Sequence, residues 1–350
     1  MPISWDRIKH AHESTKQTAA DLEQQLIANA ASAVKGAEKD LSGTSWWRLA
    51  SVRRRSRALI GTLVSRAVAT ARTAVSSATN TGRAEAEKDL RARYVPVTAT
   101  DTGPIAAAAE REVADKITAT APVAIRSSDR LYSDALSAII AQPAQSTAHR
   151  LRVAQGVLDR LSEAGITGFI DKANRNWNIV SYVEMCTKTI AANAALDAHV
   201  HTLSAHGQHL AVIDGAVDCC PVCAPWHGQL VTIDDSAAPA GVQVAGTLDD
   251  ARAAGVWHPG CRCSVESWDV GDPLPDIPEP DPRLYADRQR LRLLERRVRA
   301  GKRVLAAAMT PEAETGARQR IRAHQAEIRA HITATGVKRQ RRREQIGRAL

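Results

Sequence analysis

Two short runs rich in cysteine and histidine constrain what this chain can fold into more than any other feature. The first run is DCCPVCAPWHG, starting at Asp218, and the second is GVWHPGCRC, ending at Cys263. A Cys-x-x-Cys pair lets one tight turn aim two thiolates at a single point, and the second run adds two thiols and an imidazole. The spacing predicts one structural zinc site. Its candidate ligands are Cys220, Cys223, His258, Cys261 and Cys263, one more than a tetrahedral site needs.

Other uses of these cysteines remain open on the sequence. They could be reduced thiols in a core, or a disulfide pair in an oxidising compartment. Five of the six cysteines gather at one locus instead of being spread at disulfide spacings, which favours a reducing compartment. We predict that Cys186 and Cys219 are small buried apolar side chains and not ligands.

The residues beside the proposed ligands carry two further expectations. Trp226 and Trp257 each lie within four residues of a proposed ligand, so we expect them to shield the metal and to join the zinc loops to the helix containing SYVEM. Arg262 lies between two proposed ligands, so its side chain must point away from the metal and pair with a carboxylate or a carbonyl. The candidate carboxylates are Asp218 and Glu184.

Three motifs carry a resemblance to a known family. The runs SYVEMCTKT (181–189), CPVCAPWHGQL (220–230) and GVWHPGCRC (255–263) occur in that order. In this order they resemble the minor capsid protein 2 family of tailed bacteriophages, which is similar to the Mu F-like head morphogenesis proteins. The resemblance covers roughly residues 130–270. Two positions depart from the family pattern: Cys219 is an additional thiol, and Cys263 stands where many relatives have histidine.

The resemblance implies a role in the phage head. Members of such families associate with the portal or the capsid interior and assist head assembly, genome packaging or delivery. The expected partners are therefore the portal and/or the major capsid protein, with several copies of the chain in each virion. The expected location is the virion, at the capsid interior or the portal vertex, after a period in the host cytoplasm before assembly.

Composition and periodicity predict a mainly α fold. Only 3% of residues are aromatic, and apolar residues recur at intervals of three and four, as amphipathic helices require. We expect long N-terminal helices, a small zinc-stapled α+β domain and a C-terminal helical arm. The expected segments are an N-terminal helical region (1–95), a second helical region (96–164), the zinc-knuckle α+β domain (165–268), a proline-rich linker (269–283) and a basic C-terminal helical arm (284–350).

Start and stop signals predict where individual elements lie. The N-terminal helical region is interrupted near 41–45, and Gly165 is expected to end a helix. A change to two-residue alternation predicts a hairpin around 173–176. The remaining predicted helices are 105–119, 122–141, 147–164, 181–205, 247–254 and one that follows Pro311, and the remaining strands are 209–214 and 228–233. Leu284, Leu291, Val298 and Leu305 repeat every seven residues and predict a short coiled-coil seam.

The basic charge is concentrated at the C-terminal end. Residues 281–350 hold 19 Lys and Arg against 7 Asp and Glu, a net charge of +12, whereas the whole chain carries +9. We predict that this end meets phosphate or an acidic partner, and a solvated helical face is the alternative. The proposed nucleic-acid-binding residues, which would bind packaged DNA without sequence preference, are Lys338, Arg339, Arg341, Arg342 and Arg343. A second basic patch, Arg53, Arg54, Arg55 and Arg57, suits DNA, an acidic partner or solvent equally.

The expected metal site argues against an enzyme. A catalytic zinc keeps one coordination position open for water, whereas four protein ligands close the metal off. No His-x-Glu tripeptide of the zinc deaminases precedes Cys220. We therefore predict a structural virion protein with no catalytic residues. The competing interpretation is a zinc-braced DNA-binding protein or nuclease. No apolar run is long enough to cross a bilayer, and the N-terminus has no apolar signal segment.

Overall fold

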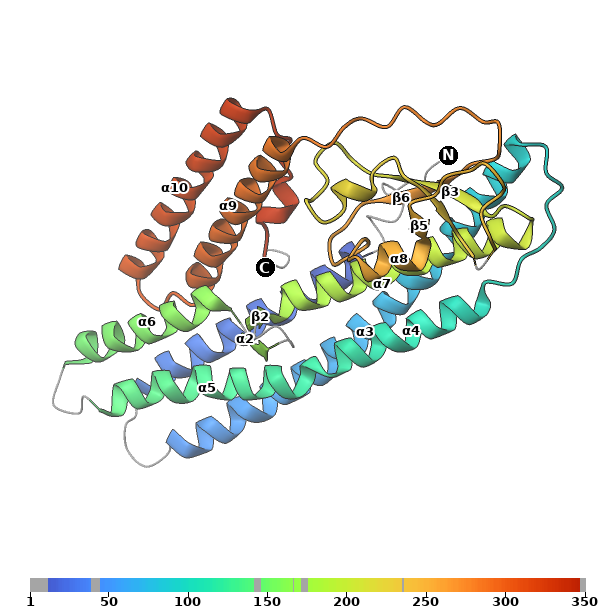
Figure 1. The fold of residues 1–350 in the computed structure, drawn as a ribbon. Helices are drawn as coiled ribbons and strands as arrows, with labels where there is room; N and C mark the ends of the chain where they lie inside the picture. Colours follow the sequence, from blue (N-terminus) through green and yellow to red (C-terminus); the bar gives the residue numbers. More distant parts are fainter. Residues whose placement is uncertain are drawn as a thin grey trace. The chain divides into compact units, whose positions relative to one another are not determined.

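The computed structural model describes residues 12–38, 45–141, 146–165, 167–170, 176–234 and 236–346. It confirms a mainly helical fold with a small mixed sheet (Figure 1). No helix in the described ranges is long and apolar enough to cross a membrane. The longer helices are α2 (Glu13–Glu38), α3 (Ser45–Ala92), α4 (Gly103–Thr118), α5 (Thr120–Ile140), α6 (Thr147–Ala164), α7 (Ile179–Ala205), α9 (Pro282–Ala306) and α10 (Pro311–Thr335).

The predicted helices are found within a few residues of their expected ends. The hairpin expected around 173–176 is also present, as β1 (Thr167–Ile170) paired with β2 (Asn176–Asn178). Its turn and most of the predicted interruption near 41–45 lie outside the described residues. The helix predicted at 247–254 is α8 (Leu248–Ala253), and Thr247 caps it by accepting a hydrogen bond from the backbone N–H of Asp250.

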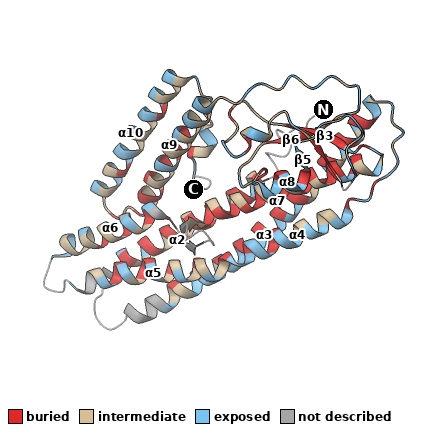
Figure 2. Ribbon diagram, in the orientation of Figure 1, coloured by how far each residue is buried: buried red, intermediate tan, exposed pale blue. Residues whose placement is uncertain are grey.

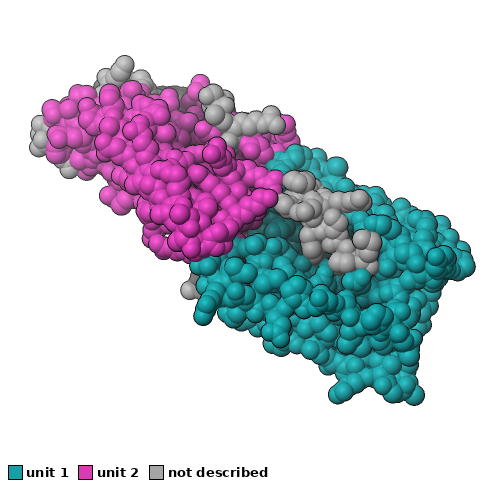
Figure 3. All heavy atoms as spheres, turned by 90° about the horizontal axis from the view of Figure 1, so that it is seen from above, with its two compact units in different colours: residues 1–14, 69–115, 184–288 teal, residues 15–68, 116–183, 289–350 magenta. Residues whose placement is uncertain are grey.

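The chain forms two compact units, each assembled from three separate stretches (Figure 3). Unit 1 contains residues 1–14, 69–115 and 184–288, and unit 2 contains residues 15–68, 116–183 and 289–350. These units do not follow the consecutive segments expected from the sequence. Residues 165–183, expected to belong with the zinc loops, group instead with unit 2.

A four-stranded sheet forms the part of unit 1 that positions the cysteines. Its strand order is β5 (Gly246–Thr247), β4 (Leu230–Thr232), β3 (Leu210–Asp214) and β6 (Ser264–Ser267). The central strand β3 runs antiparallel to both β4 and β6, and Asp214 pairs with Ser264. Its residues from Leu210 to Ile213 are all buried, as expected for a strand covered on both faces.

In unit 1, α7 is buried on nearly all sides. None of residues 184–200 is exposed (Figure 2). α3 crosses this helix at Gly82, where a Cβ atom would lie within 3.0 Å of three backbone atoms of Ala195. Only glycine lets the two backbones approach this closely. His199, one turn further along α7, is fully buried, and its Nδ1 lies 3.3 Å from the Gly82 carbonyl oxygen.

We expect Gly82→Ala to lower the free energy of unfolding by about 2–3 kcal/mol, because the added methyl group overlaps backbone that cannot move aside. Gly61→Ala on the same helix is a matched control. A Cβ at Gly61 meets nothing within 4 Å, so this change should stabilise the protein by about 0.5–1 kcal/mol through helix propensity alone. Urea denaturation of both variants measures the two effects, and equal values for the pair would contradict the close crossing.

The buried His199 predicts a loss of stability in mild acid. Burial lowers the pKa of His199 to about 4, although the Gly82 carbonyl and Asp89 oppose the shift. The ordinary pKa of histidine in an unfolded chain is about 6.5, so the unfolded state takes up the proton first as the pH falls. The free energy of unfolding should therefore fall by about 3 kcal/mol between pH 6.5 and pH 4. Urea denaturation across this range should show a shallower slope in His199→Gln, and an unchanged slope would refute the assignment.

A buried charged network joins four elements of unit 2. Arg303 of α9 donates from Nε to the Ser162 carbonyl (3.0 Å) and from Nη2 to the Glu163 carbonyl (2.6 Å), the last turn of α6. Its Nη1 also lies 3.8 Å from a carboxylate oxygen of Glu23 on α2. Asn178 of β2 donates to the same carboxylate, and its side-chain oxygen caps the first turn of α7. Glu23 is only 2% exposed and Arg303 only 8%.

In unit 2, α9 and α10 pack as a helical hairpin. Thr310 caps the start of α10 and Gly336 ends it in a left-handed conformation. The apolar contact consists of Leu291, Leu294 and Val298 from α9 and Ile328 from α10. The predicted seven-residue seam is thus buried at Leu291 and Val298, whereas Leu284 and Leu305 are half-buried.

Candidate metal centre

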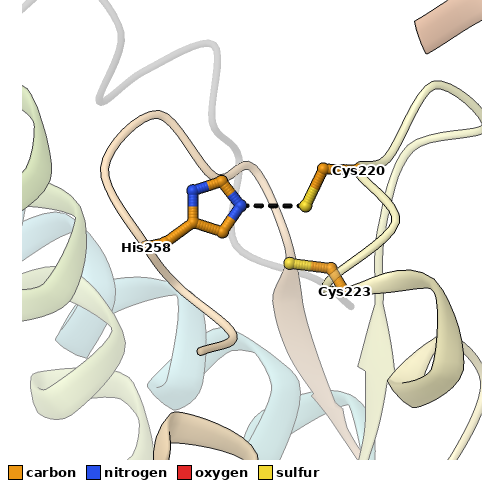
Figure 4. A group of neighbouring side chains, drawn as sticks. All are labelled: Cys220, Cys223 and His258. Carbon is orange, nitrogen blue, oxygen red and sulfur yellow. Dashed lines mark hydrogen bonds between the residues drawn. The ribbon is translucent and has the colours of Figure 1, made fainter. Parts of the chain in front are cut away.

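The sheet of unit 1 explains how two distant cysteine runs meet. The first run leaves the end of β3 at Asp214, and the second run enters β6 at Ser264. Because Asp214 and Ser264 are paired neighbours, residues that follow β3 and residues that precede β6 emerge at the same end of the sheet. Strand pairing therefore brings together cysteines that are about forty residues apart in the chain. Figure 4 shows Cys220 and Cys223 of the first run beside His258 of the second.

The first run forms a tight turn that aims two thiols in one direction. The backbone N–H groups of Cys223 and Ala224 donate to the Cys220 carbonyl, at 3.1 and 3.0 Å. Pro225 follows within a 3-10 turn, η1 (Ala224–Trp226), which continues the bend. This is the knuckle conformation that the Cys-x-x-Cys spacing predicted.

The second run is held as a loop by its tryptophan. Trp257 is buried, and its indole Nε1 donates to the Cys263 carbonyl at 2.9 Å. It adopts a positive φ of 60°, which is costly for an aromatic residue and persists only where its surroundings enforce it. Within the loop, the N–H of Cys261 donates to the His258 carbonyl at 2.8 Å.

The five predicted ligands form two overlapping groups. Cys220, Cys223 and His258 make one group, and Cys223, Cys261 and Cys263 make the other, with the ligand atoms of each group within 4.8 Å of one another. Cys220 Sγ lies 2.9 Å from His258 Nε2, and Cys223 Sγ lies 3.6 Å from Cys261 Sγ. The structure thus gathers all five residues at one locus, and Cys223 belongs to both groups.

The thiols perturb each other's protonation strongly. Hydrogen bonds from Cys223 and Cys263 lower the pKa of Cys261 far below the ordinary thiol value. The same contact with Cys261 raises the pKa of Cys223, and burial adds to that rise. At Cys263 the hydrogen bond with Cys223 acts to lower the pKa, but Cys261 and burial outweigh it and raise the pKa. The protonation of each thiol thus depends on its neighbours, and a bound cation would stabilise their thiolate forms.

Cys220 and His258 each favour the charged form of the other. Burial acts to raise the pKa of Cys220, but hydrogen bonds from the Cys223 N–H and from His258 outweigh it and lower the pKa. Burial acts to lower the pKa of His258, and the Cys220 thiolate and the Pro259 carbonyl outweigh it and raise the pKa. His258 Nδ1 lies 3.1 Å from the Pro259 carbonyl, so Nε2 is the nitrogen that faces the thiols. A metal-binding histidine is usually oriented by such a contact of its other nitrogen.

Arg262 behaves as predicted. Its Nη2 pairs with Oδ1 of Asp218, one of the two candidate carboxylates, so the side chain points away from the ligand atoms. Asp218 is 7% exposed and also pairs with Arg288 at the start of α9. Arg288 was not expected from the sequence, because its position depends on how the proline-rich segment returns to the sheet. That segment is fixed there by a hydrogen bond from the Asp281 N–H to the Val217 carbonyl at 2.7 Å.

Two neighbours of the cluster complete its surroundings. A Cβ atom at Gly215 would overlap His227 Nε2 and lie 3.0 Å from Cys263 Sγ, so these two side chains border the same space. Neither ring nitrogen of His227 makes a hydrogen bond within the described ranges. Cys219 belongs to neither ligand group and its Sγ faces the Cys220 carbonyl, while Cys186 is buried in α7.

The two tryptophans differ in their environments. Trp257, His258 and Cys261 line one small cavity together with Lys188, Thr189, Ala192 and Asn193 of α7, so the second run lies close to the SYVEM helix. Trp226 is half-buried beside Cys223, at the end of η1.

The predicted nucleic-acid-binding residues near the C-terminus are only partly exposed. Arg339 pairs with both carboxylate oxygens of Glu344, at 2.6 and 2.8 Å, and Arg343 lies 3.9 Å from Glu295. Lys338, Arg341 and Arg342 are exposed. The segment 341–344 forms a 3-10 turn, η2 (Arg341–Glu344), in which Glu344 is 2% exposed, so these residues are folded.

The sequence of the chain matches a known protein family. The family model described as "Phage minor capsid protein 2" matches residues 6–333 of the 350. The chain belongs to this family. Its membership gives this minor capsid protein a structural role in the phage head, as part of the virion, where it meets other virion components. Neither the curated proteins nor the solved structures include a significant match.

Proposed function

We propose that this minor capsid protein carries one structural zinc ion and associates with the portal or the capsid interior, where it aids head assembly, genome packaging or delivery. The convergence of Cys220, Cys223, His258, Cys261 and Cys263 at one end of the sheet is the observation that supports the metal. The family match over nearly the whole chain supports the head role.

The proposed ligand set is Cys220, Cys223, His258 and Cys261. Zinc bonds of 2.0–2.3 Å in tetrahedral geometry place neighbouring ligand atoms about 3.5–3.8 Å apart. The 3.6 Å between Cys223 and Cys261 matches this spacing, whereas the 2.9 Å between Cys220 and His258 is a hydrogen-bond distance that would lengthen around a bound ion. Cys263 contributes its backbone N–H, which donates to Cys261 Sγ at 3.4 Å. Its own thiol borders Gly215 and also lies within 4.8 Å of the Cys223 and Cys261 thiols, so it is the alternative fourth ligand.

Four protein ligands would make the zinc structural. Such a metal supplies folding free energy and keeps no open position for a water or a substrate. The four-stranded sheet of unit 1 needs the free energy of metal binding, because its strands are only two to five residues long and are joined by loops. We accordingly propose no catalytic role for the centre.

The head role can be tested on mature particles. Cross-linking mass spectrometry of intact virions should give lysine cross-links between this chain and the portal or the inner face of the major capsid protein. The chain should also resist protease in intact particles and be cleaved in ruptured ones. A chain that is absent from purified particles, or is cleaved equally in intact particles, would contradict an interior location.

We also propose that the exposed C-terminal residues Lys338, Arg341 and Arg342 contact DNA or an acidic partner. Deleting residues 337–350 should flatten the salt dependence of duplex DNA binding by about 0.9 in log–log slope for each lost phosphate contact. Zinc content should remain unchanged, because the ligands lie in another unit. If the deletion left the salt slope unaltered, residues 337–350 would have to contact protein instead of DNA.

A further inference from the structure

The N-terminal third of the chain contains a second basic region. Between Asp40 and Glu85 the sequence contains eight arginines and no Asp or Glu: Arg48, Arg53, Arg54, Arg55, Arg57, Arg66, Arg72 and Arg83. The net charge of residues 1–280 is −3, so the overall charge balance does not reveal this local excess of arginine. Almost all of the region forms α3, so its charge is displayed on a rigid helix.

Three of these arginines are exposed and have no structural task within unit 2. Arg54, Arg55 and Arg57 are exposed, and none makes a hydrogen bond or ion pair with another described residue. Arg53 differs, because its Nε lies 3.4 Å from Asp129 and joins α3 to α5. We call Arg54, Arg55 and Arg57 the α3 arginine face.

Nearby carboxylates do not neutralise this face. Asp129 on α5 is paired with Arg53, and Asp134, one turn further along α5, is paired with Arg130 at 3.4 Å. Arg126, one turn before Arg130, is exposed and adds positive charge to the same helix. Both of these α5 carboxylates are therefore already paired, so they leave the positive charge of the exposed arginines uncompensated.

The residues that follow on α3 leave room for a bulky anion. Ala58, Gly61, Thr62 and Ser65 are exposed and small. A Cβ atom at Gly61 would meet nothing within 4 Å, which shows open space above the helix. Arginine, serine and threonine are the side chains that commonly contact phosphate oxygens in DNA complexes.

The chemistry of the face favours nucleic acid over protein. Protein interfaces bury an apolar centre, usually with aromatic anchors. From Ala50 onward, where its side chains are described, α3 exposes no large apolar side chain. A face of guanidinium groups and small polar residues lacks an apolar anchor but matches a line of phosphates.

We propose that the α3 arginine face binds the phosphate backbone of duplex DNA without reading its sequence. This site is separate from the C-terminal residues and from the metal centre, so it can fail or hold independently of both. On a helix Arg54 lies about 100° from Arg55 and about 60° from Arg57 around the axis, and Arg54 and Arg57 are about 4.5 Å apart along it. The three long side chains therefore fan out on both sides of Arg54 and can contact different phosphates of one duplex.

The test compares three full-length variants that lose equal charge. Binding to a 30-base-pair duplex is followed by fluorescence anisotropy across a salt series. Arg54→Gln/Arg55→Gln/Arg57→Gln should reduce the log–log salt slope by up to about 2.7 and weaken binding at least about tenfold near physiological salt. Arg318→Gln/Arg320→Gln/Arg322→Gln on the exposed side of α10 is the charge-matched control and should bind nearly as well as the parent. Lys338→Gln/Arg341→Gln/Arg342→Gln measures the C-terminal contribution separately.

The outcomes separate the explanations. Equal losses in the α3 and α10 variants would mean that net charge alone governs binding, and unchanged binding in the α3 variant would exclude the face; either result overturns the proposal. Arg54→Lys/Arg55→Lys/Arg57→Lys should keep most of the slope, because lysine also neutralises phosphate. Circular dichroism of each variant establishes that the helices are intact. Binding to a polyglutamate peptide through the same arginines, with no binding to DNA, would also overturn it.

Discussion

Replacing Cys223 with serine is expected to abolish metal binding and unfold residues 209–268, while the helices of unit 2 stay folded. Cys223 is the member common to both ligand groups and is 1% exposed. Structural zinc contributes roughly 10–16 kcal/mol of apparent binding free energy in small zinc modules, which is comparable to the whole stability of a typical domain. Hydrogen exchange resolved by peptide should show lost protection in β3, β4 and β6 and retained protection in α9 and α10.

Cys219→Ser provides the matched control for this prediction. It makes the same chemical change at the residue next to the proposed ligand Cys220, but Cys219 belongs to neither ligand group. It should leave the zinc content and the exchange pattern unchanged. If Cys219→Ser and Cys223→Ser behaved alike, the turn would depend on its thiols for packing and not for metal binding.

Replacing Arg303 with methionine is expected to lower the free energy of unfolding of unit 2 by about 3–5 kcal/mol. The change leaves the Glu23 carboxylate buried without its cation and removes the guanidinium donors of the Ser162 and Glu163 carbonyls, of which Ser162 keeps the Gly165 N–H. Positive charge at the end of a helix is also favourable, so α6 loses a second stabilising interaction. Urea denaturation, with helix content read by circular dichroism, measures the loss.

Two comparisons show whether the effect comes from the buried network. Arg318→Met removes an exposed arginine that pairs with Glu314 on the same helix, and it should cost no more than about 0.5 kcal/mol. Glu23→Gln combined with Arg303→Met removes the uncompensated charge and should recover part of the loss. A loss in the double variant equal to the sum of the two single losses would argue against coupling between Glu23 and Arg303.

Local signals account for the parts of the fold that the sequence predicts well. Gly165 ends α6, Thr247 caps α8 and Pro311 begins α10, and each acts through contacts within one turn. The crossing at Gly82 and the Arg303 network join residues more than one hundred positions apart. No local pattern marks such a residue, because its partner is fixed only when the helices pack.

In the candidate site, too, the sequence predicted what depends on local spacing and missed what depends on packing. Cysteine spacing was enough to name the five residues that converge, and the position of Arg262 between two ligands was enough to predict its pairing with Asp218. The approach of His227 to Cys263 across Gly215 depends on the path after β3, so it had no sequence signal beyond the histidine itself. Near the C-terminus the charge count was correct, but folding pairs Arg339 and Arg343 with carboxylates that the count could not assign to them.

The metal content of the full-length protein tests the account most directly. Elemental analysis after purification without added metal should give one zinc per chain. X-ray absorption should then show three sulfur ligands at about 2.3 Å and one nitrogen at about 2.0–2.1 Å, as Cys220, Cys223, His258 and Cys261 would provide. Zinc-free protein whose residues 209–268 remain protected from hydrogen exchange, before and after treatment with a chelator, would contradict the account.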